Sequence, residues 1–297
     1  MPASTKQNNA GPMPITSAER REVRLPSGTI RYREIGSGSP IVFVHGLLVN
    51  GRLWDGVADA LAPECRCIVP DWPMGSHEVA MEASADLSPP GLASIVADFL
   101  AALELEDVTV VGNDTGGAVC QILVTTRPER IGRLVLTNCD TYEHFPPFPF
   151  SLMPRIAKLP GGMRLLSAPS RIGAVRRASY APLVAHPLDR DLVDAWVEPG
   201  LRNEGVRRDV RKATIGLDKR YTLAAAERFG QLEVPVLLAW APEDRFFKRA
   251  HAERLAGDIP GARIEWIEDA GTFVPLDQPA AVARAIRNFV ASKVSAG

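Results

Sequence analysis

The chain has 297 residues, of which 46% are hydrophobic and 23% are charged, so it can bury a large core in one domain, with or without an insertion. Its formal net charge of −1 gives no reason to expect binding to nucleic acid or to an anionic membrane. Apolar runs such as residues 234–241 are too short to cross a bilayer.

The first residues and the cysteines point to a reducing compartment. Residues 1–19 are polar and lack the apolar stretch of a secretory signal, which predicts a loose tail over residues 1–18 and a cytoplasmic protein. The four cysteines have neither the spacing of a metal cluster nor an obvious disulfide pattern. We expect them to be reduced core residues: Cys65, Cys67, Cys120 and Cys139.

Short apolar segments recur along the chain as predicted strands. Residues 22–28 and 29–36 alternate apolar and polar side chains around a turn at Ser27 and Gly28, which predicts an antiparallel hairpin. Residues 40–46 form a nearly continuous apolar run, as expected of a strand covered on both faces. Further strands are predicted at 66–72, 107–113, 132–138, 235–241 and 262–268.

Amphipathic helices alternate with these strands. Ser88 is a suitable N-cap for a helix over 88–105, and apolar residues recur on one face of that segment. The last helix is predicted over 279–293, and another over 246–257. Strands that alternate with helices predict an α/β protein: a mostly parallel β-sheet flanked by helices on both sides.

The alternation stops between residues 141 and 230, where short helices broken by proline and glycine are predicted. We interpret this segment as a helical cap on a core formed by residues 19–140 and 231–297. A cap at the carboxyl edge of the sheet would close the crevice where such sheets bind ligands. Residues 151–230 hold about 15 Lys and Arg against about 8 Asp and Glu, which indicates either steering of an anionic substrate or a solvated helical surface.

Asp114 occupies the centre of the stretch Gly112-Asn113-Asp114-Thr115-Gly116, directly after a predicted strand and before a predicted helix. A tight strand-to-helix turn needs small residues on both sides of its apex, and it thrusts the apex side chain above the sheet. The helix N-terminus there stabilises an anion, and a carboxylate can attack an electrophilic carbon to form an ester. A plain helix-capping role for Asp114 is the alternative.

The motif resembles the nucleophile elbow of the α/β-hydrolase superfamily, in the form with Asp in place of Ser that is typical of haloalkane dehalogenases and epoxide hydrolases. The resemblance begins near residue 21 and covers nearly all of the remaining chain. Besides the elbow and the cap, it includes the sequences VHG at 44–46, PDWPMGS at 70–76, APEDRF at 241–246 and GTFVPLDQP at 271–279.

The resemblance implies roles for several residues. It places an oxyanion hole at the backbone N–H groups of Leu47 and Thr115, and it gives His45 a structural role in the loop. The acid of the catalytic triad is expected at Asp244, after the penultimate strand. Some relatives place this acid after the preceding strand, where Asp140 stands, and each of the two carboxyls could instead be a solvated loop acid.

Thr272 stands where the resemblance calls for the catalytic histidine. In Asp-nucleophile enzymes this histidine activates the water that hydrolyses the ester. A threonine hydroxyl is not basic enough to accept a proton at neutral pH. We therefore expect a substitute base or a substrate contact among the following loop and cap residues: His77, Asp140, Tyr142, Tyr180 and Tyr221. For His77, a surface histidine is the alternative, and His251 is expected to be solvated.

Other motifs of the relatives are absent. Haloalkane dehalogenases usually have a halide-binding Trp after the nucleophile, where this chain has Thr115, and epoxide hydrolases usually have a proline two residues after His-Gly, where it has Leu48. We therefore expect an enzyme that hydrolyses a small organic electrophile or ester, with an anionic substrate as one alternative and with no metal or organic cofactor. The alternative is a hydrolytically impaired or non-hydrolytic homologue that binds a ligand.

Overall fold

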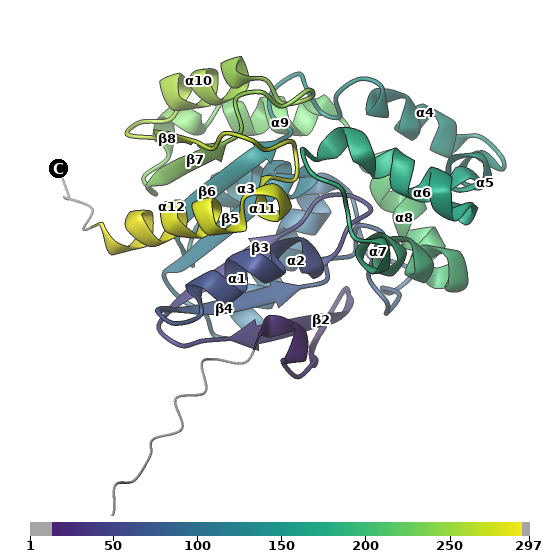
Figure 1. Cartoon of the computed structure of the whole chain (residues 1–297), viewed down its shortest axis with the longest axis horizontal. Helices are drawn as coiled ribbons and strands as arrows, with labels where there is room; N and C mark the ends of the chain where they lie inside the picture. Colours follow the sequence, from purple (N-terminus) through teal and green to yellow (C-terminus); the bar gives the residue numbers. More distant parts are fainter. Residues whose placement is uncertain (1–13, 293–297) are drawn as a thin grey trace, which may run out of the picture.

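The computed structural model describes residues 14–292, and its centre is a single eight-stranded sheet (Figure 1). The strand order is β1-β2-β4-β3-β5-β6-β7-β8. Only β1–β2 and β2–β4 pair antiparallel, and every later pair is parallel. The strands are β1 (Arg21–Leu25), β2 (Gly28–Ile35), β3 (Ser39–Val44), β4 (Cys65–Pro70), β5 (Val108–Asp114), β6 (Ile131–Cys139), β7 (Val236–Trp240) and β8 (Arg263–Trp266).

Helices cover both faces of this sheet because its central strands are apolar on both sides. On β3, Ile41 and Phe43 pack into one core cluster, and the intervening Val42 packs into another. The first cluster is completed by α1 (Asp55–Leu61) and α12 (Pro279–Ala291), and the second by α2 (Pro89–Ala102), α3 (Thr115–Thr126) and α10 (Arg249–Asp258). The predicted α/β class with helices on both faces is confirmed.

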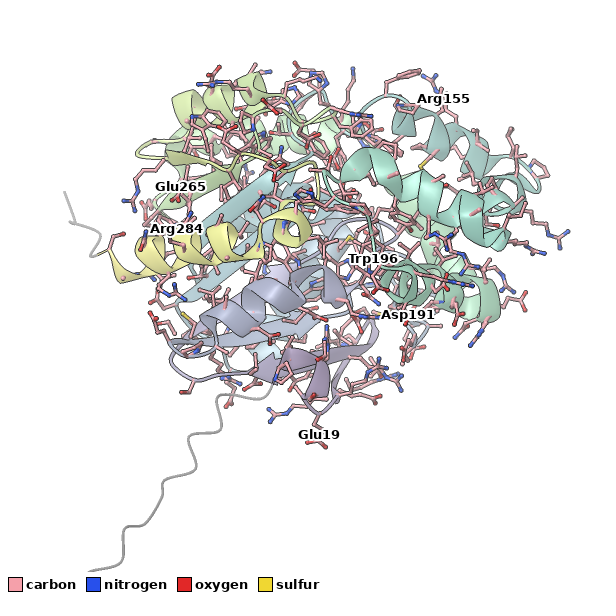
Figure 2. All side chains as sticks on the ribbon, viewed as in Figure 1. Glu19, Arg155, Asp191, Trp196, Glu265 and Arg284 are labelled. Atoms are coloured by element: carbon pink, nitrogen blue, oxygen red, sulfur yellow. The ribbon has the colours of Figure 1, made fainter. Side chains whose placement is uncertain are left out.

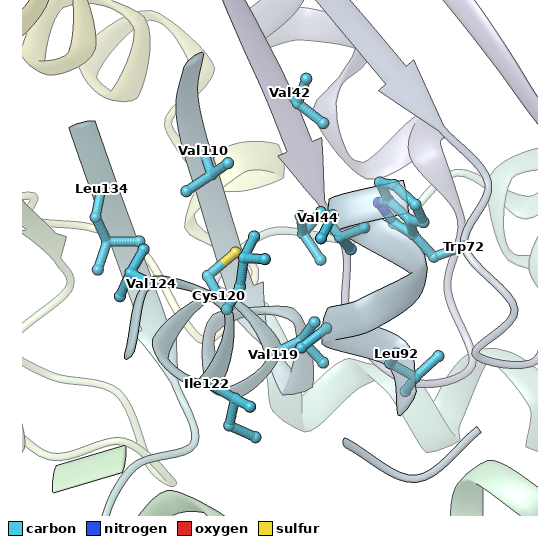
Figure 3. Close-up of a cluster of buried hydrophobic side chains, with 14 of the residues drawn as sticks. Val42, Val44, Trp72, Leu92, Val110, Val119, Cys120, Ile122, Val124 and Leu134 are labelled. Carbon is cyan, nitrogen blue, oxygen red and sulfur yellow. The ribbon is translucent and has the colours of Figure 1, made fainter. Parts of the chain in front are cut away.

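Figure 3 shows part of the second cluster. Val110 of β5 and Leu134 of β6 lie beside Cys120 of α3. All four cysteines are free and buried, as predicted. Burial raises the pKa of each of these thiols, so the cysteines act as small apolar core residues.

Six helices lie between β6 and β7, at the right and upper side of Figure 1. They are α4 (Met153–Lys158), α5 (Gly162–Ser167), α6 (Gly173–Tyr180), α7 (Arg190–Arg202), α8 (Glu204–Gly216) and α9 (Lys219–Ala226). The break in the strand-helix alternation is thus present where it was predicted. Since α9 packs against the core helix α3, the cap boundaries at 141 and 230 stay a prediction.

The predicted N-terminal tail is wrong at its end and otherwise lies outside the described residues. Ile15 is fully buried in the core cluster of α1 and α12, and its backbone N–H donates a hydrogen bond to Asp59 Oδ1 (2.6 Å). An isoleucine followed by a polar segment gave too little periodicity to show this contact. Within residues 14–292, no helix is both long and apolar enough to span a membrane.

Candidate active site

Asp114 lies at the junction of β5 and α3, in a backbone conformation that few residues other than glycine adopt. Its φ is 53° and its ψ is −131°, and α3 begins at the next residue. The turn packs tightly, because a Cβ atom on Gly116 would collide with the carbonyl oxygens of Val44 and His45. Strain held in place by close packing is typical of functional sites, and the predicted strained turn is confirmed.

The Asp114 carboxyl is partly buried and interacts with two backbone N–H groups, those of Thr115 and Leu47. Burial raises its pKa to about 7, the two N–H groups act in the opposite direction, and the charge of Asp244 adds to the rise. Gly46 leaves room for this arrangement, because a Cβ atom there would overlap Asp114 Oδ2. The two N–H groups that the sequence singled out therefore converge on the same carboxyl.

Asp244 and Thr272 form a hydrogen-bonded pair between the ends of β7 and β8. The Thr272 hydroxyl donates to Asp244 Oδ1 (3.0 Å), and Asn138 Nδ2 donates to Asp244 Oδ2 (2.9 Å). Both members of the pair are buried. Burial raises the pKa of Asp244, against the opposing effects of the Phe246 N–H and the Thr272 hydroxyl. Thr272 thus forms the hydrogen bond to Asp244 that a histidine at this position would otherwise form.

Two asparagines join the loops around these residues, and the sequence had not singled out their roles. Asn113 Nδ2 donates to the carbonyl oxygen of Thr272 (2.7 Å) and to Thr137 Oγ1 (2.8 Å). Asn138 reaches across to the β7 loop, where its Oδ1 accepts from the Ala241 N–H (2.7 Å). The only signal for them in the sequence is their position at the ends of buried strands.

Asp140 is the second buried carboxyl beside Asp114. Its Oδ2 accepts a hydrogen bond from Thr115 Oγ1 (3.1 Å), and its Oδ1 has no partner among residues 14–292. Burial, together with the charge of Asp114, holds the pKa of Asp140 well above its ordinary range. Thr115 therefore connects the two acids, through its N–H to Asp114 and through its hydroxyl to Asp140.

A model of the alpha/beta hydrolase fold matches residues 39–279 of this chain. The chain belongs to the alpha/beta hydrolase fold family. An uncharacterized protein of Mycobacterium tuberculosis is 27% identical over 96% of this chain and 85% of its own length. A cis-3-alkyl-4-alkyloxetan-2-one decarboxylase of Shewanella oneidensis is 26% identical over 88% of this chain and 85% of its own length.

The fold is also shared with solved structures. The epoxide hydrolase CorEH superposes with a TM-score of 0.78 at 19% sequence identity, covering 93% of this chain and 99% of its own. At that identity the likeness concerns the fold. Together with the matched family, it makes this alpha/beta hydrolase a member of a superfamily rich in hydrolases, and the substrate is a separate question.

His45 has the structural role that the sequence predicted. Its Nε2 accepts from the Trp72 N–H (2.8 Å), and its Nδ1 lies 2.9 Å from the carbonyl oxygen of Gly46, to which it donates as the neutral ring. Burial lowers the pKa of His45 to about 4, so the ring is neutral at pH 7 and holds the loop that carries Leu47.

His77 is not available as a substitute base, which corrects that prediction, and it is not a surface residue either. The ring is buried, with Nε2 3.2 Å from Asp209 Oδ2 of α8 and with Nδ1 accepting from the Gly75 N–H (3.4 Å). Both nitrogens are therefore engaged in fastening the 70–77 loop to the cap. His251 is partly buried rather than solvated, and its ring centroid lies 4.3 Å from that of His144.

Of the three tyrosines predicted near the site, only Tyr180 approaches it. Its hydroxyl donates to the carbonyl oxygen of Leu48 (2.8 Å), next to Leu47. Tyr142 instead donates to Asp258 of α10 (2.7 Å), and Tyr221 accepts from Arg220 (2.8 Å), so both hydroxyls are hydrogen-bonded to side chains other than those around Asp114. The partner of Tyr142 lies 116 residues away in the sequence, whereas the partner of Tyr221 is the preceding residue of the same helix.

Trp196 of the cap helix α7 packs between aromatic residues on two sides of the site. Its ring packs against Tyr180 (5.2 Å between centroids) and against Phe273 (5.7 Å), which follows Thr272. The indole is buried, and its N–H has no acceptor among residues 14–292. A buried donor without a partner is costly, and such a group beside a site is a candidate for contact with a ligand.

Proposed function

We propose that this alpha/beta hydrolase is an enzyme in which the Asp114 carboxylate attacks an electrophilic carbon of a small organic molecule. The observation that carries the proposal is the Asp114 carboxyl at the apex of a strained turn, held by the N–H groups of Leu47 and Thr115. A carboxylate oxygen would form a new C–O bond to the substrate, and the leaving group would depart with the bonding electrons. In an epoxide the leaving oxygen stays attached to the carbon skeleton as an alkoxide and takes up a proton from water, whereas in a β-lactone attacked at its alkyl carbon it stays attached as a carboxylate.

The site favours an uncharged substrate. Asp114, Asp140 and Asp244 approach one another, and within residues 14–292 none of these carboxyls has a hydrogen bond or ion pair from a Lys, Arg or His side chain. An anionic substrate would find no cationic partner among these groups. Haloalkanes, epoxides and small cyclic esters remain, and the likeness to an oxetan-2-one decarboxylase supports the last class.

The second half of a hydrolytic cycle is where this chain differs from its relatives. General-base assistance is worth about 10²–10⁴-fold, and the Thr272 hydroxyl, which donates to Asp244, cannot supply it. We therefore expect an ester on Asp114 to form and then to turn over slowly. The same hydrogen bond favours the alternative function, a hydrolytically impaired or non-hydrolytic homologue that retains its ligand.

Intact-mass spectrometry after exposure to a panel of haloalkanes, epoxides and β-lactones tests the proposal. We expect a covalent adduct that peptide mapping places on Asp114 and that is absent in Asp114→Asn. Asp71→Asn is the matched control, because Asp71 is also a partly buried carboxyl whose pKa is raised by burial. Absence of any adduct across the panel would overturn the nucleophile proposal. A ligand that raises the melting temperature without an adduct would support the binding alternative.

Thr272→His tests the missing base. With a histidine beside Asp244, we expect release of the product from the Asp114 ester to accelerate about 10²-fold or more, measured as decay of the adduct mass. Thr272→Val serves as the matched variant, because it removes the hydroxyl without adding a base and should leave the decay slow. If the histidine variant decays no faster than the wild type, the site serves a reaction other than hydrolysis.

A further inference from the structure

Residues 144–188 contain no acidic side chain. Within this segment, which begins five residues after the last residue of β6 and ends just before Asp189, there are six basic residues: Arg155, Lys158, Arg164, Arg171, Arg176 and Arg177. Among the residues that the structure describes, only Arg176 of these six forms an ion pair, with Asp194 of α7. The basic excess of the cap is therefore concentrated in one segment of a chain whose net charge is −1.

The same segment holds nearly all of the exposed large apolar side chains in residues 14–292. Leu165 is 68% exposed, Leu159 and Ile172 are 60% exposed, and the only large exposed apolar residue outside the segment is Leu223 of α9. The full set within it is Phe148, Leu152, Leu159, Leu165, Ile172 and Val175. Scattered exposed leucines are ordinary, but a cluster of them marks an interaction surface.

The helices that carry or border most of these side chains lie on one side of the molecule. The elements α4, α5 and α6 contact one another in sequence, through the short 3-10 helix Pro169–Arg171, and form the outer part of the cap (Figure 1). Arg155 projects from this part, whereas Arg284 lies on α12 at the opposite end of the molecule (Figure 2). We call the exposed apolar and basic side chains between residues 155 and 177 the cap surface: Leu159, Leu165, Ile172 and Val175 with Arg155, Lys158, Arg164, Arg171 and Arg177.

We infer that the cap surface docks on an anionic lipid bilayer. Exposed leucine and isoleucine side chains would enter the boundary between head groups and acyl chains, and the arginines and lysine beside them would meet the lipid phosphates. Charge complementarity decides the occupant, because a surface with five unpaired basic side chains and no acid in its own segment repels a second copy of itself. The low net charge of the whole chain does not reveal that basic residues are concentrated in this segment.

Docking would bring the substrate site close to the lipid. Tyr180 ends α6 and donates to the carbonyl oxygen of Leu48, so the helix that carries part of the cap surface also contacts the loop beside Asp114. An apolar substrate dissolved in the bilayer would then reach the crevice from the docked side. The docking itself does not depend on the proposed chemistry and is measured without a substrate.

Vesicle sedimentation tests the docking on the full chain. We expect at least about tenfold more protein bound to phosphatidylcholine vesicles that contain phosphatidylglycerol than to pure phosphatidylcholine, with the excess lost in about 1 M NaCl. The paired variants Arg164→Glu with Arg171→Glu, and Leu165→Ser with Ile172→Ser, should each reduce binding about tenfold or more. Circular dichroism and thermal melting confirm that both variants are folded.

Matched controls lie outside the cap surface. Arg284→Glu reverses an exposed charge on α12, and Leu223→Ser removes the exposed leucine of α9, and both should bind vesicles like the wild type. Equal binding to both lipid compositions, or unchanged binding by the cap-surface variants, would overturn the inference. So would a concentration-dependent dimer in light scattering that the Leu165→Ser and Ile172→Ser changes abolish, because the surface would then be an interface between copies.

Discussion

At the scale of single residues, burying the reactive carboxyl of the site lowers the stability of the folded protein. Asp114 is held with a pKa of about 7, so folding favours its protonated form at a pH where an unfolded aspartate is ionised. The fraction of molecules that carry the carboxylate needed for the proposed reaction therefore increases through neutral pH. The fraction rises above pH 7, and the rate of adduct formation should rise with it.

Asp114→Asn should stabilise the protein at high pH. The raised pKa means that the wild type loses stability as the pH rises from about 4 to about 7, because the unfolded state releases the proton of Asp114 over this range whereas the folded state keeps it. One pKa unit corresponds to about 1.4 kcal/mol, so the shift from 3.8 to about 7 sets an upper bound of about 4 kcal/mol. Urea unfolding at pH 4.5 and pH 8 measures it. An equal difference between variant and wild type at both values would contradict the raised pKa.

The residues of the site differ in how far the sequence predicted them. Asp114, Asp244 and Thr272 lie at fixed offsets from predicted strands, and the carboxyl ends of parallel strands meet at one edge of a sheet, so their proximity was predictable. The role of His77 was not predictable, because its partner Asp209 lies 132 residues away in the sequence, on a cap helix. A sequence pattern does not encode a contact between two segments whose relative placement depends on tertiary packing.

At the scale of elements, the sharp turn from β5 into α3 fixes the geometry around Asp114. The strands β2 to β8 were predicted to within two residues at either end, because buried parallel strands are apolar runs bounded by polar loops. Strand β1 ends at Leu25, three residues before the predicted end at residue 28. Helix α1 was not predicted, since its seven residues give Val57, Ala58 and Leu61 too short a pattern to separate from a loop. The turn itself was predictable from its glycines, because the close packing of the turn requires residues without a Cβ atom.

Gly116→Ala should disrupt the turn. The new methyl group would overlap backbone carbonyl oxygens of Val44 and His45, which are fixed by β3, so we expect a loss of about 3 kcal/mol or more in unfolding free energy and loss of adduct formation. Gly257→Ala is the matched control, because it lies inside α10 with open space around its Cα and should gain up to about 1 kcal/mol. Equal melting temperatures for the two variants would argue against a close-packed turn.

At the scale of the whole molecule, the cap is fastened to the core by a buried charge. Asp209 of α8 is fully buried, and its carboxylate accepts from the Met81 N–H (2.7 Å) and from Arg208 (2.8 Å), besides the contact with His77. Burial opposes the charged form of Asp209, but these hydrogen bonds outweigh it and hold its pKa below the ordinary value. One ionised side chain of α8 thus binds the 77–81 segment, in addition to the hydrogen bond between Tyr180 and Leu48.

Asp209→Asn should loosen the cap. Removing one member of a buried charged network costs about 3 kcal/mol, and we expect faster hydrogen exchange in α8 and in the 75–81 loop. Because the folded pKa of Asp209 is depressed, its contribution is present above the unfolded carboxyl pKa of about 3.9 and is lost as the pH falls through the folded pKa. The stability difference between variant and wild type should therefore shrink below about pH 4. Glu204→Gln, an exposed change on the same helix, should stay within about 0.5 kcal/mol of the wild type, and an equal effect of the two changes would show that the cap is held by other contacts.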